Sequence, residues 1–123
     1  MCGIAGYLGR KKISKKLIYK TLNLMKNRGP DNQNYKLYRV FDLNLYMLHS
    51  RLNIIDINKR SNQPYFFKDY AIIFNGEIYN YLELKHDLKK KGVKFSTNSD
   101  TEVLLKSYLF YGLKFLKNLE GMW

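Results

Sequence analysis

Two neighbouring stretches of the chain, residues 35–40 and 43–48, alternate apolar and polar side chains. Alternation with a period of two is the pattern of a β-strand that buries one face. Asp42 lies between the two stretches and is a residue type typical of turns. The pattern predicts two strands joined by a turn, and the apolar face of such a pair must be covered by other elements.

Three further stretches are predicted to be strands. Residues 2–9 are apolar and carry glycines where another backbone can approach closely. Residues 52–57 are rich in isoleucine, and residues 70–74 form an apolar run that ends at Asn75-Gly76. Together with the alternating pair, these stretches predict a fold with a substantial β component.

Helices are predicted at residues 14–27, 81–91 and 99–111, with a short last one at 113–119. The first carries an apolar stripe with helical spacing, and its lysines lie largely outside that stripe. Strands and helices do not alternate strictly, which favours an α+β fold over a parallel α/β sheet. Predicted caps and ends support these limits: Ser14 and Gly29 for the first, Asn80 with Glu83 and Gly92 for the second, Ser99 with Glu102 and Gly112 for the third.

Size and composition indicate one globular domain of 123 residues, with 46% hydrophobic and 26% charged residues. The sequence shows no apolar run long enough to span a membrane and no secretory signal pattern. Its single cysteine excludes an internal disulfide. These features predict a cytoplasmic protein without a membrane partner.

The formal net charge of +12 raises the question of nucleic-acid binding. The lysines are scattered, however, and mostly lie between apolar positions of the predicted helices, where a solvated helix face explains them. No reading motif accompanies them. We therefore do not expect nucleic acid as a partner, although a basic binding module is kept as an alternative class.

Cys2 is the first candidate for chemistry, although a cysteine is most often a small buried hydrophobe. Because Cys2 is small, we expect removal of Met1, which leaves Cys2 with a free α-amine. An α-amine has a reference pKa of about 8, so near neutral pH it can act as a base. One residue would then carry both the nucleophile and its base, as in N-terminal nucleophile hydrolases.

A series of short motifs runs along essentially all 123 residues: CGIAG at 2–6, RGPD at 28–31, HSRLNIID at 49–56, QP at 63–64, NGEIYN at 75–80, SDTE at 99–102 and LEGMW at 119–123. In this order the series resembles class II glutamine amidotransferases, and in particular the asparagine synthetase branch. It differs mildly at Ser50, where a charged residue is common in the family, and at Asn53, where serine is common.

The resemblance implies an αββα sandwich of two antiparallel sheets. It also implies that residues 1–123 are the N-terminal part of a type 2 glutamine amidotransferase domain, incomplete at the C-terminus and lacking the ATP-dependent synthetase domain. In such an enzyme, ammonia from L-glutamine amidates aspartate, and ATP and Mg are expected only in the missing domain. The resemblance further implies a synthetase domain in cis if the natural chain is longer, and it is compatible with a homodimer.

The same resemblance assigns roles to individual residues. Cys2 would be the nucleophile, and the Asn75 side chain and Gly76 N–H would form the oxyanion hole. Arg51 would bind the α-carboxylate of glutamine, since a guanidinium suits a carboxylate. Asp100, with Glu77 nearby, would accept the α-ammonium group. Backbone groups would line the rest of the pocket: Leu52, Asn53, Ile54 and Ile55.

Plainer interpretations stay open for several of these residues. Asn75-Gly76 is also the pattern of an ordinary hairpin turn. Arg51 could be a surface arginine, and Asp100 a helix cap. His49 could be proposed as a base or, with His86 and Cys2, as a metal ligand, but the α-amine already supplies a base and the spacing gives no local ligand pair, so we expect no metal.

Three alternatives to asparagine synthesis remain at this level. The chain could be an inactive truncated fragment, or it could serve as an interaction module, because missing sandwich strands would leave sheet edges exposed. It could also be the glutaminase half of an amidotransferase that acts on another acceptor, such as a sugar.

Overall fold

The computed structural model describes residues 2–123, so the predicted removal of Met1 lies outside the described residues. The chain divides into two compact units. Unit 1 comprises the residues up to Asn53 together with Asn62–Asn75, and unit 2 comprises Ile54–Ser61 and Gly76–Trp123. The combination of helices with antiparallel strands confirms the α+β prediction in this general form.

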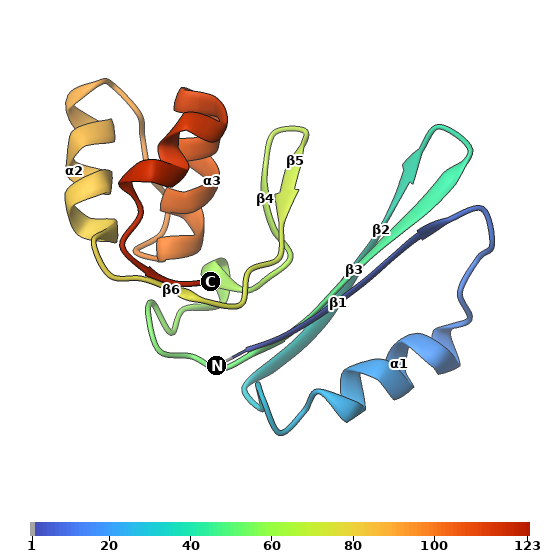
Figure 1. The fold of residues 1–123 in the computed structure, drawn as a ribbon. Helices are drawn as coiled ribbons and strands as arrows, with labels where there is room; N and C mark the ends of the chain where they lie inside the picture. The colour runs from blue at the N-terminus through green and yellow to red at the C-terminus, as the bar shows by residue number, and fades with distance from the viewer. Residues whose placement is uncertain (1) are drawn as a thin grey trace. The chain divides into compact units, whose positions relative to one another are not determined.

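Unit 1 is built on a three-stranded antiparallel sheet in which β3 (Leu43–Arg51) lies between β1 (Gly3–Gly9) and β2 (Asn32–Val40) (Figure 1). The predicted first strand and the predicted strand pair are confirmed, and the chain turns at Phe41-Asp42. The pair extends further than predicted at its open end. The prediction stopped short because residues 32–34 and 49–51 are polar and do not continue the alternation. These extra residues matter because the last part of β3 is fully buried.

Helix α1 (Lys15–Leu24) covers one face of this sheet (Figure 1). Its predicted cap is confirmed, since the Ser14 hydroxyl accepts a 3.3 Å hydrogen bond from the Leu17 N–H. Ile18 and Leu22 are buried against apolar side chains of β3. The helix ends three residues earlier than predicted, because the chain must turn there to bring residues 28–31 back to the end of β3.

The remainder of unit 1 is a small hairpin of β4 (Tyr65–Phe67) and β5 (Tyr70–Ile72). Strand β5 confirms part of the predicted strand at 70–74, whereas β4 was not predicted. The strand predicted at 52–57 is wrong, because these residues form a loop. Asp56 has a φ of +48°, and its neighbours bond to side chains instead of to a strand ladder.

Unit 2 contains two helices, α2 (Tyr81–Lys90) and α3 (Asp100–Tyr111), and a short antiparallel pair of β6 (Glu77–Ile78) and β7 (Gly121–Met122). Two 3₁₀ helices complete it, η1 (Lys59–Ser61) and η2 (Gly112–Asn118). Gly92 and Gly112 have positive φ after α2 and α3, as the sequence predicted for helix ends. The buried apolar side chains of this unit are Ile78, Leu88, Val103, Leu105 and Phe115.

The two predicted capping boxes form only in part. Ser99 caps α3, since its hydroxyl accepts a 3.1 Å hydrogen bond from the Thr101 N–H. Glu102 does not reach back to Ser99, because its carboxylate binds the preceding loop. Asn80 makes no side-chain cap to α2 and instead bonds the Asn118 carbonyl and the Glu120 N–H at 2.8 and 3.1 Å. The polar groups that resembled capping pairs therefore serve longer-range contacts.

The core between α1 and the sheet gives a test of the fold. We expect Leu22→Ala to lower the free energy of unfolding by about 2–5 kcal/mol, because the Leu22 side chain is 2% exposed. Leu24→Ala is the matched control, since Leu24 lies on the same helix and is 77% exposed. Urea unfolding followed by circular dichroism measures both changes, and equal effects of the two substitutions would contradict this packing.

Candidate functional site

Cys2 lies in unit 1 directly before β1, and its side chain is half-buried. Because Gly3 pairs with Ser50 across the sheet, Cys2 comes opposite the end of β3. The Leu52 backbone N–H points at the sulfur, with 3.4 Å between the nitrogen and Sγ. This contact with a backbone donor fixes the position of the sulfur at the end of β3.

The RGPD turn holds this arrangement from one side. The Arg28 guanidinium donates to the Cys2 carbonyl through Nε at 3.0 Å. Gly29 lies so close to the Ser50 carbonyl that a Cβ at this position would overlap it. The Asp31 N–H donates to the Arg51 carbonyl at 3.0 Å, and the Asp31 carboxylate accepts from the Asn53 N–H at 2.7 Å. The sequence identified these residues only as a family motif without individual roles, and their contacts fix both Cys2 and residues 51–53.

Arg51 is the last residue of β3 and is only 4% exposed, so the surface-arginine interpretation is wrong. Its Nη1 donates to the Asn62 side-chain oxygen at 2.8 Å. Asn62 was not identified from the sequence, because it lies in no motif and is adjacent to Arg51 only in the fold. A buried guanidinium held by such contacts has a fixed orientation, which a bidentate carboxylate contact requires.

His49 is fully buried on β3 and lies 3.2 Å from the Phe74 carbonyl through Nε2. Burial lowers the pKa of His49 to about 4, and the positive charge of Arg51 acts in the same direction. The ring is therefore neutral near pH 7, and Nε2 carries the proton that it donates to Phe74. This histidine acts as a structural link in unit 1, since its Nε2 proton is used in that bond.

The Phe74 backbone is fixed on both sides, which orients the residue after it. Its N–H donates to the Gln63 side-chain oxygen at 2.6 Å, and its carbonyl accepts from His49. Asn75 follows, and its buried Oδ1 has no hydrogen-bond partner within residues 2–123. Asn75-Gly76 does not join two paired strands, because β5 pairs with β4 and β6 pairs with β7. The hairpin-turn interpretation of this dipeptide is therefore wrong.

Asp100 lies in unit 2 as the first residue of α3 and is 6% exposed. It is not the helix cap, because Ser99 occupies that position. Its Oδ2 accepts from the Ile78 N–H at 3.2 Å, next to the half-buried Glu77. No lysine or arginine of the described chain forms an ion pair with it.

The surroundings of Asp100 make its ionised form less favourable than that of a solvent-exposed aspartate. Burial raises the pKa of Asp100, and the charge of Glu77 adds to that effect, whereas hydrogen bonds from Ile78 and Thr101 oppose it. A bound cation would offset the cost of keeping this buried carboxylate ionised. The geometry therefore suits an ammonium group as the partner of Asp100.

The structure groups the predicted site residues by unit. Unit 1 brings Cys2, Arg51, Leu52 and Asn53 together at the end of β3, with Asn75 connected to that strand through Phe74 and His49. Unit 2 holds Glu77 and Asp100 side by side through Ile78. Ile54, Ile55 and Gly76 also belong to unit 2, and the predicted substrate contacts of their backbone groups stay predictions.

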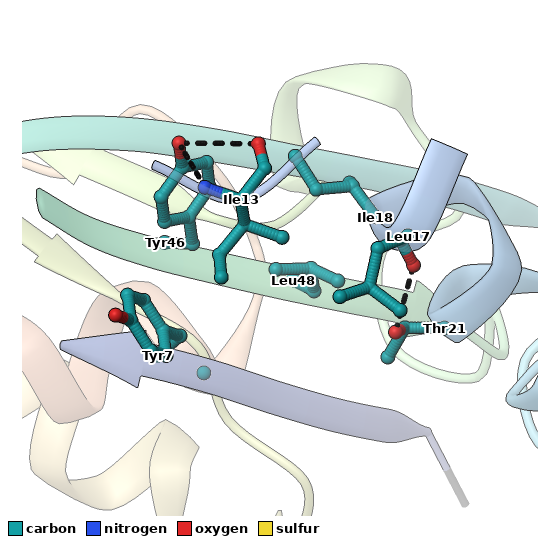
Figure 2. A pocket seen from close by; sticks show the side chains of 8 residues that line it. Tyr7, Ile13, Leu17, Ile18, Thr21, Tyr46 and Leu48 are labelled. Atoms are coloured by element: carbon teal, nitrogen blue, oxygen red, sulfur yellow. Dashed lines mark hydrogen bonds between the residues drawn. The ribbon is translucent and has the colours of Figure 1, made fainter. Parts of the chain in front are cut away.

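A separate apolar pocket of about 150 Å³ lies in unit 1 between α1 and the sheet (Figure 2). Its wall includes Ile13, Leu17 and Leu48, and the Tyr46 hydroxyl there accepts from the Ile13 N–H at 3.1 Å. None of the residues that line it is a predicted site residue. The pocket is thus a gap in the helix–sheet packing, distinct from the cluster around Cys2.

The whole chain, residues 1–123, matches the family model described as the glutamine amidotransferase domain. The chain belongs to this family, a class of enzymatic domains, as its motifs predicted.

Its relatives narrow the comparison further. The chain is 39% identical, over 99% of its length, to asparagine synthetase [glutamine-hydrolyzing] 1 of Bacillus subtilis, of which it covers 20%. It is 35% identical over its whole length to the putative asparagine synthetase [glutamine-hydrolyzing] 2 of Methanocaldococcus jannaschii, of which it covers 27%. It is 37% identical to asparagine synthetase [glutamine-hydrolyzing] 2 of Oryza sativa, of which it covers 20%. The chain thus spans about a fifth to a quarter of the length of these relatives, and its resemblance to the asparagine synthetase branch is confirmed.

No helix within residues 2–123 has the length and apolar character that crossing a membrane requires. No three histidine, cysteine, aspartate or glutamate side chains in the same range are grouped closely enough to hold a metal ion.

The neutral, buried His49 predicts a pH dependence of stability. The unfolded chain takes up a proton on this residue near pH 6.5, whereas the folded chain does so only near pH 4. Stability should therefore be fully present above pH 6.5 and fall as the pH drops towards 4, by at most about 3 kcal/mol from this residue.

His49→Gln removes the titration and keeps an N–H donor, so urea unfolding of this variant should change less with pH over that interval than unfolding of the unsubstituted chain. The exposed His86 provides the control. If His86→Gln flattens the pH profile and His49→Gln does not, the assignment of the depressed pKa to His49 is wrong.

Proposed function

We propose that this chain is the glutamine-hydrolysing part of an asparagine synthetase, with Cys2 as the nucleophile. The observation that carries the proposal is the position of the Cys2 sulfur, 3.4 Å from the Leu52 nitrogen, at the end of the strand that carries the buried Arg51. The family match and the names of the relatives support glutamine as the nitrogen donor. Both units would be parts of one glutaminase domain with an αββα sandwich fold.

Recognition of glutamine would use one group of each charge. Arg51 would bind the α-carboxylate, and Asp100 with Glu77 would bind the α-ammonium group. Backbone groups would hold the rest of the substrate: Leu52, Asn53, Ile54 and Ile55. A zwitterionic amino acid needs this pair of opposite charges. A buried arginine, and a buried aspartate that forms no ion pair within residues 2–123, are consistent with it.

The first half of the reaction forms a thioester. The Cys2 sulfur attacks the side-chain amide carbon of glutamine, while the Cys2 α-amine, exposed after removal of Met1, takes the thiol proton. The oxygen of the tetrahedral intermediate accepts hydrogen bonds from the Asn75 side-chain nitrogen and the Gly76 N–H. The carbon–nitrogen bond then breaks, the α-ammonium returns its proton to the leaving nitrogen, and ammonia departs.

The second half of the reaction restores the enzyme. Water attacks the γ-glutamyl thioester, with the α-amine again as the base, and the same two donors stabilise the oxyanion. Breaking the carbon–sulfur bond releases glutamate and the free thiol. We propose that ammonia then passes to a synthetase domain in cis. That domain would bind ATP and Mg and would use the ammonia to convert aspartate to asparagine. The names of the relatives, all asparagine synthetases, favour this acceptor over a sugar.

Replacing the nucleophile tests the proposal directly. Cys2→Ala should reduce glutamate release from glutamine by at least about 1,000-fold, because no other group forms the thioester. A coupled glutamate assay measures the rate, and the intact mass of the unsubstituted protein shows whether Met1 has been removed. A Cys2→Ala variant that hydrolyses glutamine at the unsubstituted rate would rule out this mechanism.

Replacing the side-chain donor tests the oxyanion hole. We expect Asn75→Ala to lower kcat for glutamine hydrolysis by about 100- to 1,000-fold with a small change in KM, because the donor acts mainly in the transition state. The exposed Asn27 serves as the control, and Asn27→Ala should leave both constants unchanged. A change in KM alone for Asn75→Ala would assign this residue to substrate binding instead.

A further inference from the structure

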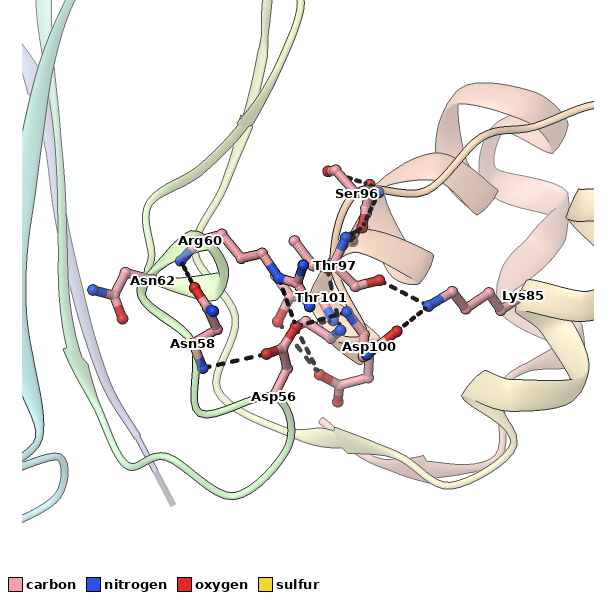
Figure 3. A network of polar contacts seen from close by, with 12 residues as sticks. Asp56, Asn58, Arg60, Asn62, Lys85, Ser96, Thr97, Asp100 and Thr101 are labelled. Atoms are coloured by element: carbon pink, nitrogen blue, oxygen red, sulfur yellow. Dashed lines mark hydrogen bonds and ion pairs between the residues drawn. The ribbon is translucent and has the colours of Figure 1, made fainter.

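A carboxylate in unit 2 connects two segments that are 42 residues apart in the sequence (Figure 3). The Asp56 Oδ2 accepts a hydrogen bond from the Asn98 backbone N–H at 2.7 Å, and Oδ1 accepts from the Asn58 N–H at 3.2 Å. The Arg60 guanidinium lies 3.5 Å from Oδ2, and the Asp56 side chain is 6% exposed. Asp56 therefore bridges the segment 54–61 and the loop before α3.

Asp56 has an unusual backbone conformation and an ionised side chain, and both suit its role as the bridge between these segments. Its φ of +48° is uncommon for a residue other than glycine and persists where surrounding contacts hold it. Burial would raise the pKa of Asp56, but the N–H groups of Asn98 and Asn58 and the charge of Arg60 hold it below the ordinary value. The side chain is therefore an ionised acceptor at neutral pH.

The loop that Asp56 contacts is also held from its other side. The Glu102 carboxylate accepts from the backbone N–H groups of Ser96 and Thr97, at 2.9 and 2.6 Å. The Lys85 ammonium donates to the Thr97 carbonyl at 2.7 Å and to the Asn98 side chain at 3.0 Å. Residues 96–98 therefore have little freedom to move without breaking a buried polar contact.

A short chain of contacts leads from this loop to Asp100. The Thr97 hydroxyl accepts from the Ser99 N–H at 3.2 Å, and the Ser99 hydroxyl caps α3. Asp100 follows as the first helical residue, and its Oδ2 accepts from the Ile78 N–H. The position of Asp100 thus depends on where residues 96–98 are held.

We propose that Asp56 is a positioning residue for substrate recognition. Through its hydrogen bond from the Asn98 N–H, it fixes the position of Asp100 relative to the Ile54–Ile55 backbone. The inference rests on the proposed function, in which Asp100 binds the α-ammonium group of glutamine. Asp56 touches no substrate and acts only through its neighbours. Because small misplacements of a binding group are costly, loss of this bridge lowers recognition of the ammonium group.

The test measures how fast Cys2 is alkylated by two chloroketones. One is the glutamine-like 2-amino-4-oxo-5-chloropentanoate, and the other is 4-oxo-5-chloropentanoate, which lacks the amino group. Mass spectrometry of the full chain gives both rates without requiring turnover. In the unsubstituted chain the amino-acid probe should react faster, and equal rates would contradict the proposed glutamine site itself.

Asp100→Asn should abolish most of the preference for the amino-acid probe. If the preference is retained, Asp100 does not bind the ammonium group.

Asp56→Asn should reduce the same preference by about 10-fold or more while the rate with the desamino probe changes little. The matched control is Asp87→Asn, which removes an exposed carboxylate of α2 that pairs with Lys91 at 2.7 Å, and it should leave the preference unchanged.

Two further variants separate positioning from a general loss of structure. Asp56→Glu keeps the charge beside Arg60 but displaces the acceptor oxygen, so it should show the same selective loss even if Asp56→Asn folds poorly. The double variant of Asp56→Asn with Asp100→Asn should lose no more preference than Asp100→Asn alone, because both act at one contact. Equal slowing with both probes, or additive losses, would overturn the role of Asp56 while leaving the proposed function intact.

Discussion

The pairing of β3 with strands on both of its edges is the constraint on which the candidate site in unit 1 depends. Opposite Ser50, strand β1 begins at Gly3, and this register places Cys2 beside the residues that follow β3. A slip of one residue would turn every side chain of a strand to the other face, so the register is set by the packing of α1 on the sheet. The same packing that stabilises unit 1 therefore places its only thiol.

In unit 2, the corresponding constraint is that each buried carboxylate needs partners that offset the cost of burying its charge. Burial alone would raise the pKa of Glu102, but hydrogen bonds from Lys106, Thr97 and Ser96 hold it at about 2. Asp100, by contrast, is buried with N–H and hydroxyl donors but no cation among the described residues. One carboxylate of α3 is satisfied within the protein and serves structure, and the other is left with an unmet preference for positive charge, as a binding group would be.

Much of the fold could be predicted from the sequence, because strand alternation, apolar stripes and helix caps are local signals. The predictions failed where a local pattern was outweighed by distant contacts. The loop at 52–57 looks like a strand by composition, yet the N–H groups of Leu52 and Asn53 point at the Cys2 sulfur and the Asp31 carboxylate. The Asp56 carboxylate in turn accepts from the Asn58 N–H. Asn80 and Glu102 fit capping patterns, yet their side chains serve segments elsewhere in the chain or the preceding loop.

The candidate site divides in the same way. Cys2, Arg51, Asn75 and Asp100 could be named from motifs, since each motif combines a reactive residue with its immediate neighbours in sequence. Asn62, Arg28 and Asp56 could not be given roles, because what they contact is decided by the fold. The order of the motifs indicated the candidate reactive and binding residues. The residues that support them can be recognised only from their contacts in the fold.

The two hydrogen bonds on the Phe74 backbone have a consequence for how such a domain can vary. They clamp the peptide unit ahead of Asn75, whereas Gly76 on its other side has the freest backbone of any residue type. The Asn75 residue is therefore held rigidly on its Phe74 side only. Substitutions at Gln63 or His49 would loosen the Phe74 backbone, and with it the position of the Asn75 side chain, without changing any of the residues proposed to contact the substrate.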